Sequence, residues 1–393
     1  MRRHSPYLIS LSLFGFACHE ATTIDEGITL DASVVVEEHV DPRTGIPIST
    51  YRIPGANLHG GYFAQSLFLD DETFYALSDH DGGHDIYLLR EGMLESVGEL
   101  EGMDVYEDAH SFGLTPTLSD HWLFYSDGTK LYRVPRGVSR DDGALPETFT
   151  APTGERLFAP LYTTRDGRYV SVTITRESEP GVNYIARIDF NTGDVRYFRS
   201  PVLGTENPFV DHAQIHPFDP DRILFAREGS WVLDRVWLWN LETDTAAPMW
   251  NHPPFTEAGH EKWTEDGSEI YLVQYGQPAR GIPSSLNFIE GQDQISTMGV
   301  SEEHYLAHAA LRPDGRYFVA DTYRADDEGL LWLVVYDVEA GIYHRVTPID
   351  IGAHPAHPHP VWSPNGERFQ WTACEEDQLV IREAALADVL ATG

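Results

Sequence analysis

Cysteine is scarce in this chain of 393 residues, which contains only Cys18 and Cys374. Cys18 lies in an N-terminal segment that we expect to be processed, so Cys374 is left without an intrachain partner and a disulfide framework is excluded. Long apolar runs are also lacking, because the stretch of residues 7–16 is too short for a membrane helix, which needs about 20 residues. Hydrophobic residues nevertheless make up 41% of the chain, enough for a large core.

Basic residues are few as well. The chain has 27 Lys and Arg against 62 Asp and Glu, a formal net charge of −35. Such a surface repels nucleic acid and anionic membranes, so neither is a predicted partner. It also repels an acidic oligosaccharide at long range, but salt screens this repulsion over about 8 to 10 Å. An acidic ligand therefore requires a local group of cations.

The N-terminus has the pattern of an export signal. Arg2 and Arg3 precede the apolar run, and Gly15-Phe16-Ala17-Cys18 resembles a bacterial lipobox, in which the cysteine is lipidated. We expect residues 1–25 to be a signal peptide of the lipoprotein type and residues 26–393 to form a single domain. The mature protein would be exported, periplasmic or held at the outer membrane by a lipid anchor, without a transmembrane span. Export without lipidation is the alternative.

A repeat of about 50 residues organises the rest of the chain. Each copy has an apolar run, a turn such as Pro-Asp-Gly, and further β-branched and aromatic runs, a pattern typical of strands joined by hairpins. The copies begin near Ala64, Gly113, Pro160, Ala213, Glu261, Ala309 and Pro360. This spacing predicts an all-β, seven-bladed β-propeller with blades like those of TolB or WD40 proteins. Residues 34–54 would add a closing strand. A two-sheet sandwich, the alternative, does not repeat at this interval.

Histidines occur in register with this repeat. His260, His308 and His359 each precede a turn glycine by seven residues, and His212 stands at the matching place one blade earlier. The first strand of each propeller blade lines the axis, so equivalent positions on neighbouring blades point at a shared space. We expect these four imidazoles to meet at one mouth of the central channel. A lone histidine there would be a hydrogen-bonded channel residue instead.

The last of these histidines belongs to a proline-stiffened segment. In His357-Pro358-His359-Pro360 the two histidines are two residues apart, so in an extended strand their side chains leave the same face. His354 lies one short loop upstream. Together with His308, these residues predict a divalent metal site with the ligands His308, His354, His357 and His359. Imidazole ligands suit zinc, copper, nickel and iron alike, so the ligand type leaves the ion open.

Two arginines lie in the sequence of the same blades and narrow the choice of reaction. The planar guanidinium of Arg235 or Arg227 matches a carboxylate in bidentate fashion. A metal, an arginine and a histidine base are the groups that elimination from a uronic acid requires, because the C5 proton becomes acidic once the carboxylate is neutralised. The alternative for Arg235 is a salt bridge to Asp234 or Glu228. Paired glycosidase carboxylates are not evident, which disfavours a hydrolase.

These motifs resemble the oligogalacturonate lyases, a family of seven-bladed propeller enzymes of pectin degradation. The match is best from Asp211-His212 onward and includes Asp234-Arg235-Val236-Trp237, Gly259-His260-Glu261-Lys262-Trp263 and His357-Pro358-His359-Pro360. The resemblance implies a carbon–oxygen lyase that cleaves short galacturonides by β-elimination. It also implies that His308, His357 and His359 bind manganese, that His260 is the base and that Arg235 neutralises charge. We further expect His212, Arg227 and His59 to bind the substrate.

Two departures from the family pattern bear on specificity. His354 stands where the family has a glutamine ligand, and a softer ligand set would favour zinc or iron over manganese. Arg227 stands where the family has histidine. Export adds a third difference, since the family members are cytoplasmic, and a different uronate is therefore an alternative substrate. From another functional class, the alternative is a non-enzymatic exported propeller that binds a metal or a protein partner.

Overall fold

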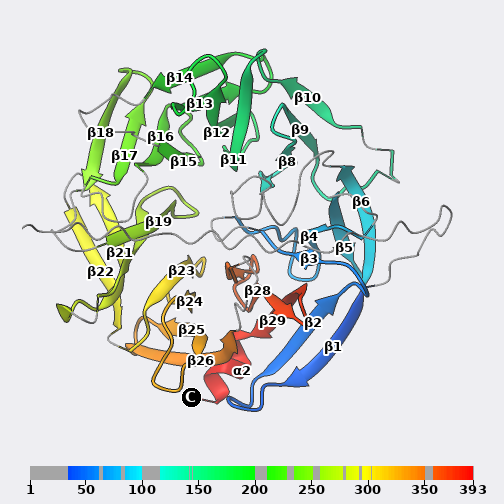
Figure 1. Ribbon diagram of the computed structural model, residues 1–393, viewed down its shortest axis with the longest axis vertical. Coiled ribbons are helices and arrows are strands. Elements are labelled where there is room, and N and C mark those ends of the chain that lie inside the picture. Colours follow the sequence, from blue (N-terminus) through cyan, green and yellow to red (C-terminus); the bar gives the residue numbers. More distant parts are fainter. Residues whose placement is uncertain are drawn as a thin grey trace, which may run out of the picture. The chain divides into compact units, whose positions relative to one another are not determined.

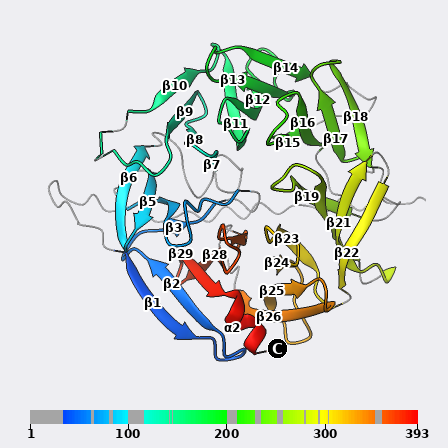
Figure 2. The same cartoon turned by 180° about the vertical axis from the view of Figure 1, so that it is seen from behind.

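The computed structural model describes most of the chain after the N-terminal segment. Residues 32–393 form one compact unit. The described residues are 34–61, 65–80, 85–99, 116–140, 142–143, 145–199, 210–227, 234–250, 257–277, 280–291, 294–301, 303–349 and 357–392. Within them, seven antiparallel sheets follow one another around a ring, as Figures 1 and 2 show from opposite sides. The predicted seven-bladed β-propeller is confirmed.

Each of the first six blades has four strands, ordered from the axis outward. Blade 1 consists of β3 (Leu58–His59), β4 (Phe74–Ser78), β5 (Asp85–Arg90) and β6 (Met93–Glu99). Blade 2 consists of β7 (Thr117–Leu118), β8 (Trp122–Ser126), β9 (Lys130–Pro135) and β10 (Glu147–Thr150). Blade 3 consists of β11 (Glu155–Thr163), β12 (Tyr169–Arg176), β13 (Asn183–Asp189) and β14 (Val195–Arg199).

The next three blades carry most of the predicted site. Blade 4 consists of β15 (Val210–Ile215), β16 (Arg222–Arg227), β17 (Val236–Asn240) and β18 (Thr245–Trp250). Blade 5 consists of β19 (Glu257–Trp263), β20 (Ile270–Tyr275), β21 (Ser284–Gly291) and β22 (Gln294–Ser301). Blade 6 consists of β23 (Leu306–Leu311), β24 (Tyr317–Thr322), β25 (Leu331–Asp337) and β26 (Ile342–Ile349).

The seventh blade joins the two ends of the described chain. Its order is β27 (Val361–Trp362), β28 (Arg368–Glu375), β29 (Gln378–Ala385), β2 (Pro47–Arg52) and β1 (Val35–Val40). Strand β2 pairs with β29 in antiparallel register, with Tyr51 opposite Ile381. The sequence predicts one closing strand from residues 34–54, and the structure places two there. Closure of this kind removes the exposed sheet edges that an open ring would leave.

The turn glycines of the repeat hold neighbouring blades together. Gly267 has a φ of +70° and Gly366 a φ of +68°, in the left-handed region that glycine adopts without strain. A Cβ on Gly267 would lie 2.6 Å from the His216 ring, and one on Gly366 would lie 2.6 Å from Arg312. The Gly267 carbonyl oxygen also lies 2.9 Å from His216 Nε2, and the Gly366 carbonyl oxygen accepts a hydrogen bond from Arg312 Nε at 2.8 Å. Glycine is therefore required at both positions, because of the positive φ and because a Cβ would collide with the neighbouring side chain.

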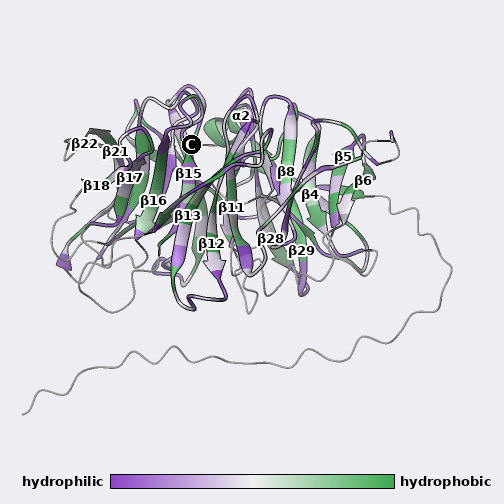
Figure 3. Cartoon of the chain, turned by 90° about the horizontal axis from the view of Figure 1, so that it is seen from above, coloured by the Kyte–Doolittle hydropathy of each residue, from purple (hydrophilic) through white to green (hydrophobic). Residues whose placement is uncertain are grey.

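The hydrophobic core lies between the blades. Central strands such as β24 are buried along their whole length, because each blade packs on a neighbour at either side. Figure 3 shows the hydrophobic residues along the strands and hydrophilic residues at many of the turns. One helix is present in the described residues, α2 (Leu386–Ala391), which packs Leu386 and Val389 on blades 6 and 7. No helix in that part of the chain is long and apolar enough to cross a membrane.

Candidate functional site

The innermost strands of three successive blades are bulged at the same place. Their pairing with the second strand shifts between Asp211 and Gln214 in β15, between Gly259 and Lys262 in β19, and between Leu306 and Ala309 in β23. Each interruption contains one of the histidines found in register, namely His212, His260 or His308. A bulge bends its strand and turns a side chain out of the regular alternation. These bulges therefore set the direction of the histidines.

The backbone at these histidines is strained. His212, His260 and His359 have φ angles of 55°, 54° and 45°, in the left-handed region that residues other than glycine rarely adopt. Such a conformation costs about 1–3 kcal/mol and is concentrated at functional sites. The expectation of an extended backbone through His359 is therefore wrong, because its left-handed turn precedes β27. Three of the seven non-glycine residues with a positive φ in the described chain are histidines of this mouth, which makes it the candidate functional site.

Three histidines from blades 6 and 7 form a cluster at this mouth. The nearest ring nitrogens of His308, His357 and His359 all lie within 4.8 Å of one another. The His308 ring centroid is 4.3 Å from that of His359 and 5.1 Å from that of His357. The structure thus brings together three of the four predicted metal ligands. The fourth, His354, lies outside the described residues.

Asp321 on β24 orients the central histidine of this cluster. Its carboxylate accepts the His308 backbone N–H at 2.6 Å and contacts Nδ1 at 2.8 Å. A carboxylate only accepts hydrogen bonds, so Nδ1 carries the proton and Nε2 keeps its lone pair. Carboxylate–histidine pairs of this kind hold metal ligands in other proteins. Sequence spacing gives no hint of Asp321, because only strand pairing places it behind His308.

His260 lies beside the cluster with a different set of contacts. Its ring centroid is 4.1 Å from that of His308. Nδ1 lies 2.7 Å from the Ala307 carbonyl oxygen, which only accepts, so this nitrogen carries the proton and Nε2 is the basic one. Burial, followed by the charges of neighbouring histidines and of Arg235, holds the pKa of His260 well below its ordinary value.

Tyr275, at the end of β20, is a further contact of His260. Its hydroxyl oxygen lies 2.7 Å from His260 Nδ1. The residue before His260 makes room for it, since a Cβ on Gly259 would lie 2.5 Å from that hydroxyl. Tyr275 was not predicted as a site residue. In the sequence, only the glycine that precedes His260 indicates that another side chain occupies the space beside it.

Glu261 connects two predicted site residues and was likewise not predicted. It is fully buried, accepts a hydrogen bond from Arg235 Nε at 3.0 Å and contacts His212 Nδ1 at 3.1 Å. Burial alone would raise the pKa of Glu261, but the Arg235 guanidinium and the His212 hydrogen bond outweigh it and hold the pKa well below its ordinary value. The carboxylate is therefore charged and fixes both partners.

Comparisons with known proteins show which proteins this chain resembles. No protein-family model matches the chain. An oligogalacturonate lyase of Dickeya dadantii is 24% identical over 374 residues, covering 85% of this chain and 91% of that protein. An oligogalacturonide lyase of Pectobacterium atrosepticum is 23% identical, with the same coverage. Over most of its length the chain is therefore similar to oligogalacturonate lyases, in agreement with the resemblance, and this similarity indicates an enzyme of the lyase class.

A solved structure shows the same fold. An oligogalacturonate lyase in complex with manganese superposes with a TM-score of 0.73 at 21% identity, covering 90% of this chain and 96% of that one. In this chain, the bulged inner strands and the closing blade place the candidate site at one mouth of the channel.

Two further predicted site residues are His59 and Arg227. His59 ends β3 and is buried. It is also one of the neighbours of His359. The pKa of His359 lies well below its ordinary value, first because of burial and then because of the charges of His308, His357, His59 and His260. Arg227 ends β16 and forms an ion pair with both carboxylate oxygens of Asp234. Asp234 is thus the partner of Arg227. Arg235 pairs instead with Glu261, and its other proposed partner, Glu228, lies outside the described residues.

Proposed function

We propose that the protein is a metal-dependent lyase that cleaves short galacturonate oligosaccharides by β-elimination, as in pectin degradation. One observation carries the proposal. The ring centroid of His260, whose Nε2 is basic, lies 4.1 Å from that of His308, the central member of the three-histidine cluster. A base beside a cation site is the arrangement that abstraction of a proton α to a carboxylate requires. The names of the relatives support the substrate.

The cluster fits a divalent transition metal. Three imidazoles whose nitrogens lie within 4.8 Å of one another form a suitable donor set, and Asp321 supports His308 from behind. His308, His357 and His359 would hold the ion, with His354 as a fourth ligand. The manganese complex of the similar lyase favours Mn²⁺, and the imidazole-rich ligand set leaves Zn²⁺ and Fe²⁺ as alternatives. When bound, the ion would neutralise the substrate carboxylate and so acidify the C5 proton.

The side chains of this chain would divide the elimination between them. His260 Nε2 takes the C5 proton, the C5–H electrons form the C4=C5 double bond, and the C4–O bond breaks. The departing sugar oxygen then takes up a proton. Arg235, held in place by Glu261, is positioned to reduce the carboxylate charge, and His212, Arg227 and His59 are proposed substrate contacts. The whole step needs no external oxidant or reductant.

A direct assay tests this proposal. The protein is incubated with digalacturonate and Mn²⁺, and product is followed by the ultraviolet absorbance of unsaturated uronates and by a ketouronate colour test. His260→Ala should reduce turnover by at least about 100-fold, the contribution typical of a general base, while bound metal measured by elemental analysis stays unchanged. A panel of other uronates distinguishes a different substrate. No product from any of them would refute the proposed lyase activity.

We further propose that the protein is exported, that its signal segment within residues 1–25 is cleaved before Cys18, and that Cys18 becomes the lipidated N-terminus. The arginine pair, the short apolar run and the lipobox-like Gly15-Phe16-Ala17-Cys18 support this. Mass spectrometry of the N-terminal peptide from the native host tests it. An acylated Cys18 is the expected result, a cleaved but unmodified N-terminus would leave export alone, and an intact Met1 would refute both.

A further inference from the structure

Three tyrosines in contact with one another lead from His260 to the protein surface. Tyr275, whose hydroxyl contacts His260, packs edge-on against Tyr323, with ring centroids 5.7 Å apart. Tyr323 packs in turn against Tyr305, at 6.2 Å. Tyr305 directly precedes β23 and Tyr323 directly follows β24, so both lie at the end of blade 6 where the inner strand begins, before His308. This group of rings therefore borders the mouth that holds the histidines.

Tyr323 is exposed to solvent and yet held in one orientation. The residue is 43% exposed. Its hydroxyl donates a hydrogen bond to the Gly276 carbonyl at 2.5 Å, and its backbone N–H donates to the Tyr305 carbonyl at 2.9 Å. Burial of the hydroxyl, and then the charge of Glu257, raises the pKa of Tyr323 to about 12, so the hydroxyl keeps its proton. The ring is thus a preorganised apolar surface, and a ligand that packs on it loses little conformational entropy in the protein.

Arg324 places a cation beside these rings. Its guanidinium carbon lies 5.5 Å from the centroid of the Tyr305 ring, and the residue is exposed. Within the part of the chain that the structure describes, no salt bridge involves Arg324. A chain with a net charge of −35 repels acidic ligands, so a cation without a carboxylate partner is where such a ligand can be held. A planar guanidinium binds a carboxylate through two parallel hydrogen bonds.

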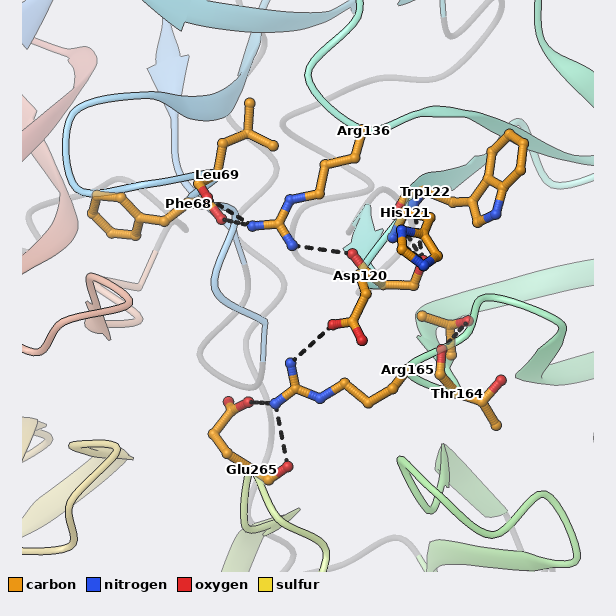
Figure 4. A network of polar contacts seen from close by, with 11 residues as sticks. Phe68, Leu69, Asp120, His121, Trp122, Arg136, Thr164, Arg165 and Glu265 are labelled. Atoms are coloured by element: carbon orange, nitrogen blue, oxygen red, sulfur yellow. Dashed lines mark hydrogen bonds and ion pairs between the residues drawn. The ribbon is translucent and has the colours of Figure 1, made fainter.

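A similar pair at the opposite end of the inner strands has a structural role instead. Phe218, 61% exposed in the turn after β15, has the Arg165 guanidinium 5.9 Å from its ring centroid. Figure 4 shows Arg165 between two carboxylates, with Nη2 at 2.7 Å from Glu265 Oε2 and Nη1 at 3.4 Å from Asp120 Oδ1. Arg165 therefore joins turns of different blades and is already neutralised. Arg324 differs because no such carboxylate pairs with it among the described residues.

One kind of ligand combines what these side chains recognise. The C–H face of a pyranose ring is apolar and packs on a flat aromatic ring, and the carboxylate of a uronate pairs with a guanidinium. We propose that Tyr305, Tyr323 and Arg324 form a second sugar subsite, which binds the uronate residue adjoining the one at the histidines. This rests on the proposed lyase function, because only an oligosaccharide reaches both places. The subsite would make the enzyme favour oligosaccharides over a single uronate.

Calorimetric titration of the full chain with digalacturonate tests the cation, with a chelator present so that no cleavage accompanies binding. Arg324→Ala should raise the Kd about fivefold, the upper end for an exposed ion pair, and Arg324→Lys should restore most of the affinity. The Kd of neutral digalactose should not change. Arg316→Ala is the matched control, because Arg316 lies 5.4 Å from the Tyr317 ring at the other end of β24. An unchanged Kd in Arg324→Ala, or no binding by the wild type, would overturn the proposal.

The same titration tests the aromatic surface. Tyr323→Ala should raise the Kd of digalacturonate and of neutral digalactose alike, by about two- to tenfold, because packing on a ring does not depend on the ligand's charge. Tyr323→Phe keeps the ring and should bind like the wild type. Phe218→Ala removes an exposed ring at the opposite end and should leave both Kd values unchanged. Wild-type affinity in a Tyr323→Ala protein that is folded by circular dichroism would contradict the subsite.

Kinetics separate this subsite from the lyase function on which it rests. In an active enzyme, Arg324→Ala should raise KM for digalacturonate about fivefold and leave kcat near the wild-type value, because Arg324 holds a sugar and not the reacting atoms. Turnover with an unchanged KM in this variant would refute the subsite alone. Binding that depends on Arg324 in a protein without turnover would refute only the lyase.

Discussion

Replacing Asp321 by asparagine should weaken metal binding without removing a ligand. The wild-type carboxylate accepts two hydrogen bonds from His308, at 2.6 Å from the backbone N–H and 2.8 Å from Nδ1. Asparagine preserves the shape but removes the charge that favours the Nδ1–H tautomer and strengthens the Nε2 donor. Loss of such a partner typically lowers metal affinity about 10- to 100-fold. At about 1.4 kcal/mol per tenfold, the binding free energy should fall by about 1.4–2.8 kcal/mol.

Competition against a chelator with a coloured Mn²⁺ or Zn²⁺ complex measures this affinity in the folded protein. The matched control is Asp337→Asn in the same blade, where the carboxylate accepts the Ala340 N–H in a turn and lies outside the histidine cluster. That variant should bind metal like the wild type. An Asp321→Asn protein that is folded by circular dichroism and binds metal with wild-type affinity would refute the role given to Asp321.

Three further predictions follow from the contacts around His260. Glu261→Gln removes the carboxylate that pairs with the buried Arg235 guanidinium. The free energy of unfolding, measured in urea, should fall by about 3–5 kcal/mol, and a loss under 1 kcal/mol would contradict the buried pair. Because the folded pKa of Glu261 lies below its ordinary value of 4.5, its contribution is full above pH 4.5 and is lost as pH falls towards the folded pKa. The stability gap between wild type and Glu261→Gln should therefore narrow in acid, and a gap that widens below pH 4.5 would contradict this sign. Tyr275→Phe removes the hydroxyl at 2.7 Å from His260 and should reduce kcat with bound metal unchanged, whereas unaltered turnover would make the contact structural.

The amino-acid sequence by itself determined the architecture. A repeat of about 50 residues with a turn glycine in each copy predicts the ring, since the apolar faces of such units are buried only against one another. The register of His260, His308 and His359 with that repeat predicts their convergence, because equivalent positions of inner strands share the axis. The signal is strong because one physical rule acts on every blade. Small errors remain at the edges, such as the two closing strands where one was expected.

Tertiary structure alone decided the partners of these residues. Asp321 and Tyr275 lie on second strands, and only strand pairing brings them to His308 and His260. The bulges at the histidines depend on cross-strand geometry that no local propensity encodes, as the left-handed φ angles at His212 and His260 illustrate. Arg235 likewise pairs with Glu261 in the next blade rather than with its sequence neighbour Asp234. Periodicity sets where backbones run, whereas the choice among several nearby charges depends on distances and burial that exist only once the ring has closed.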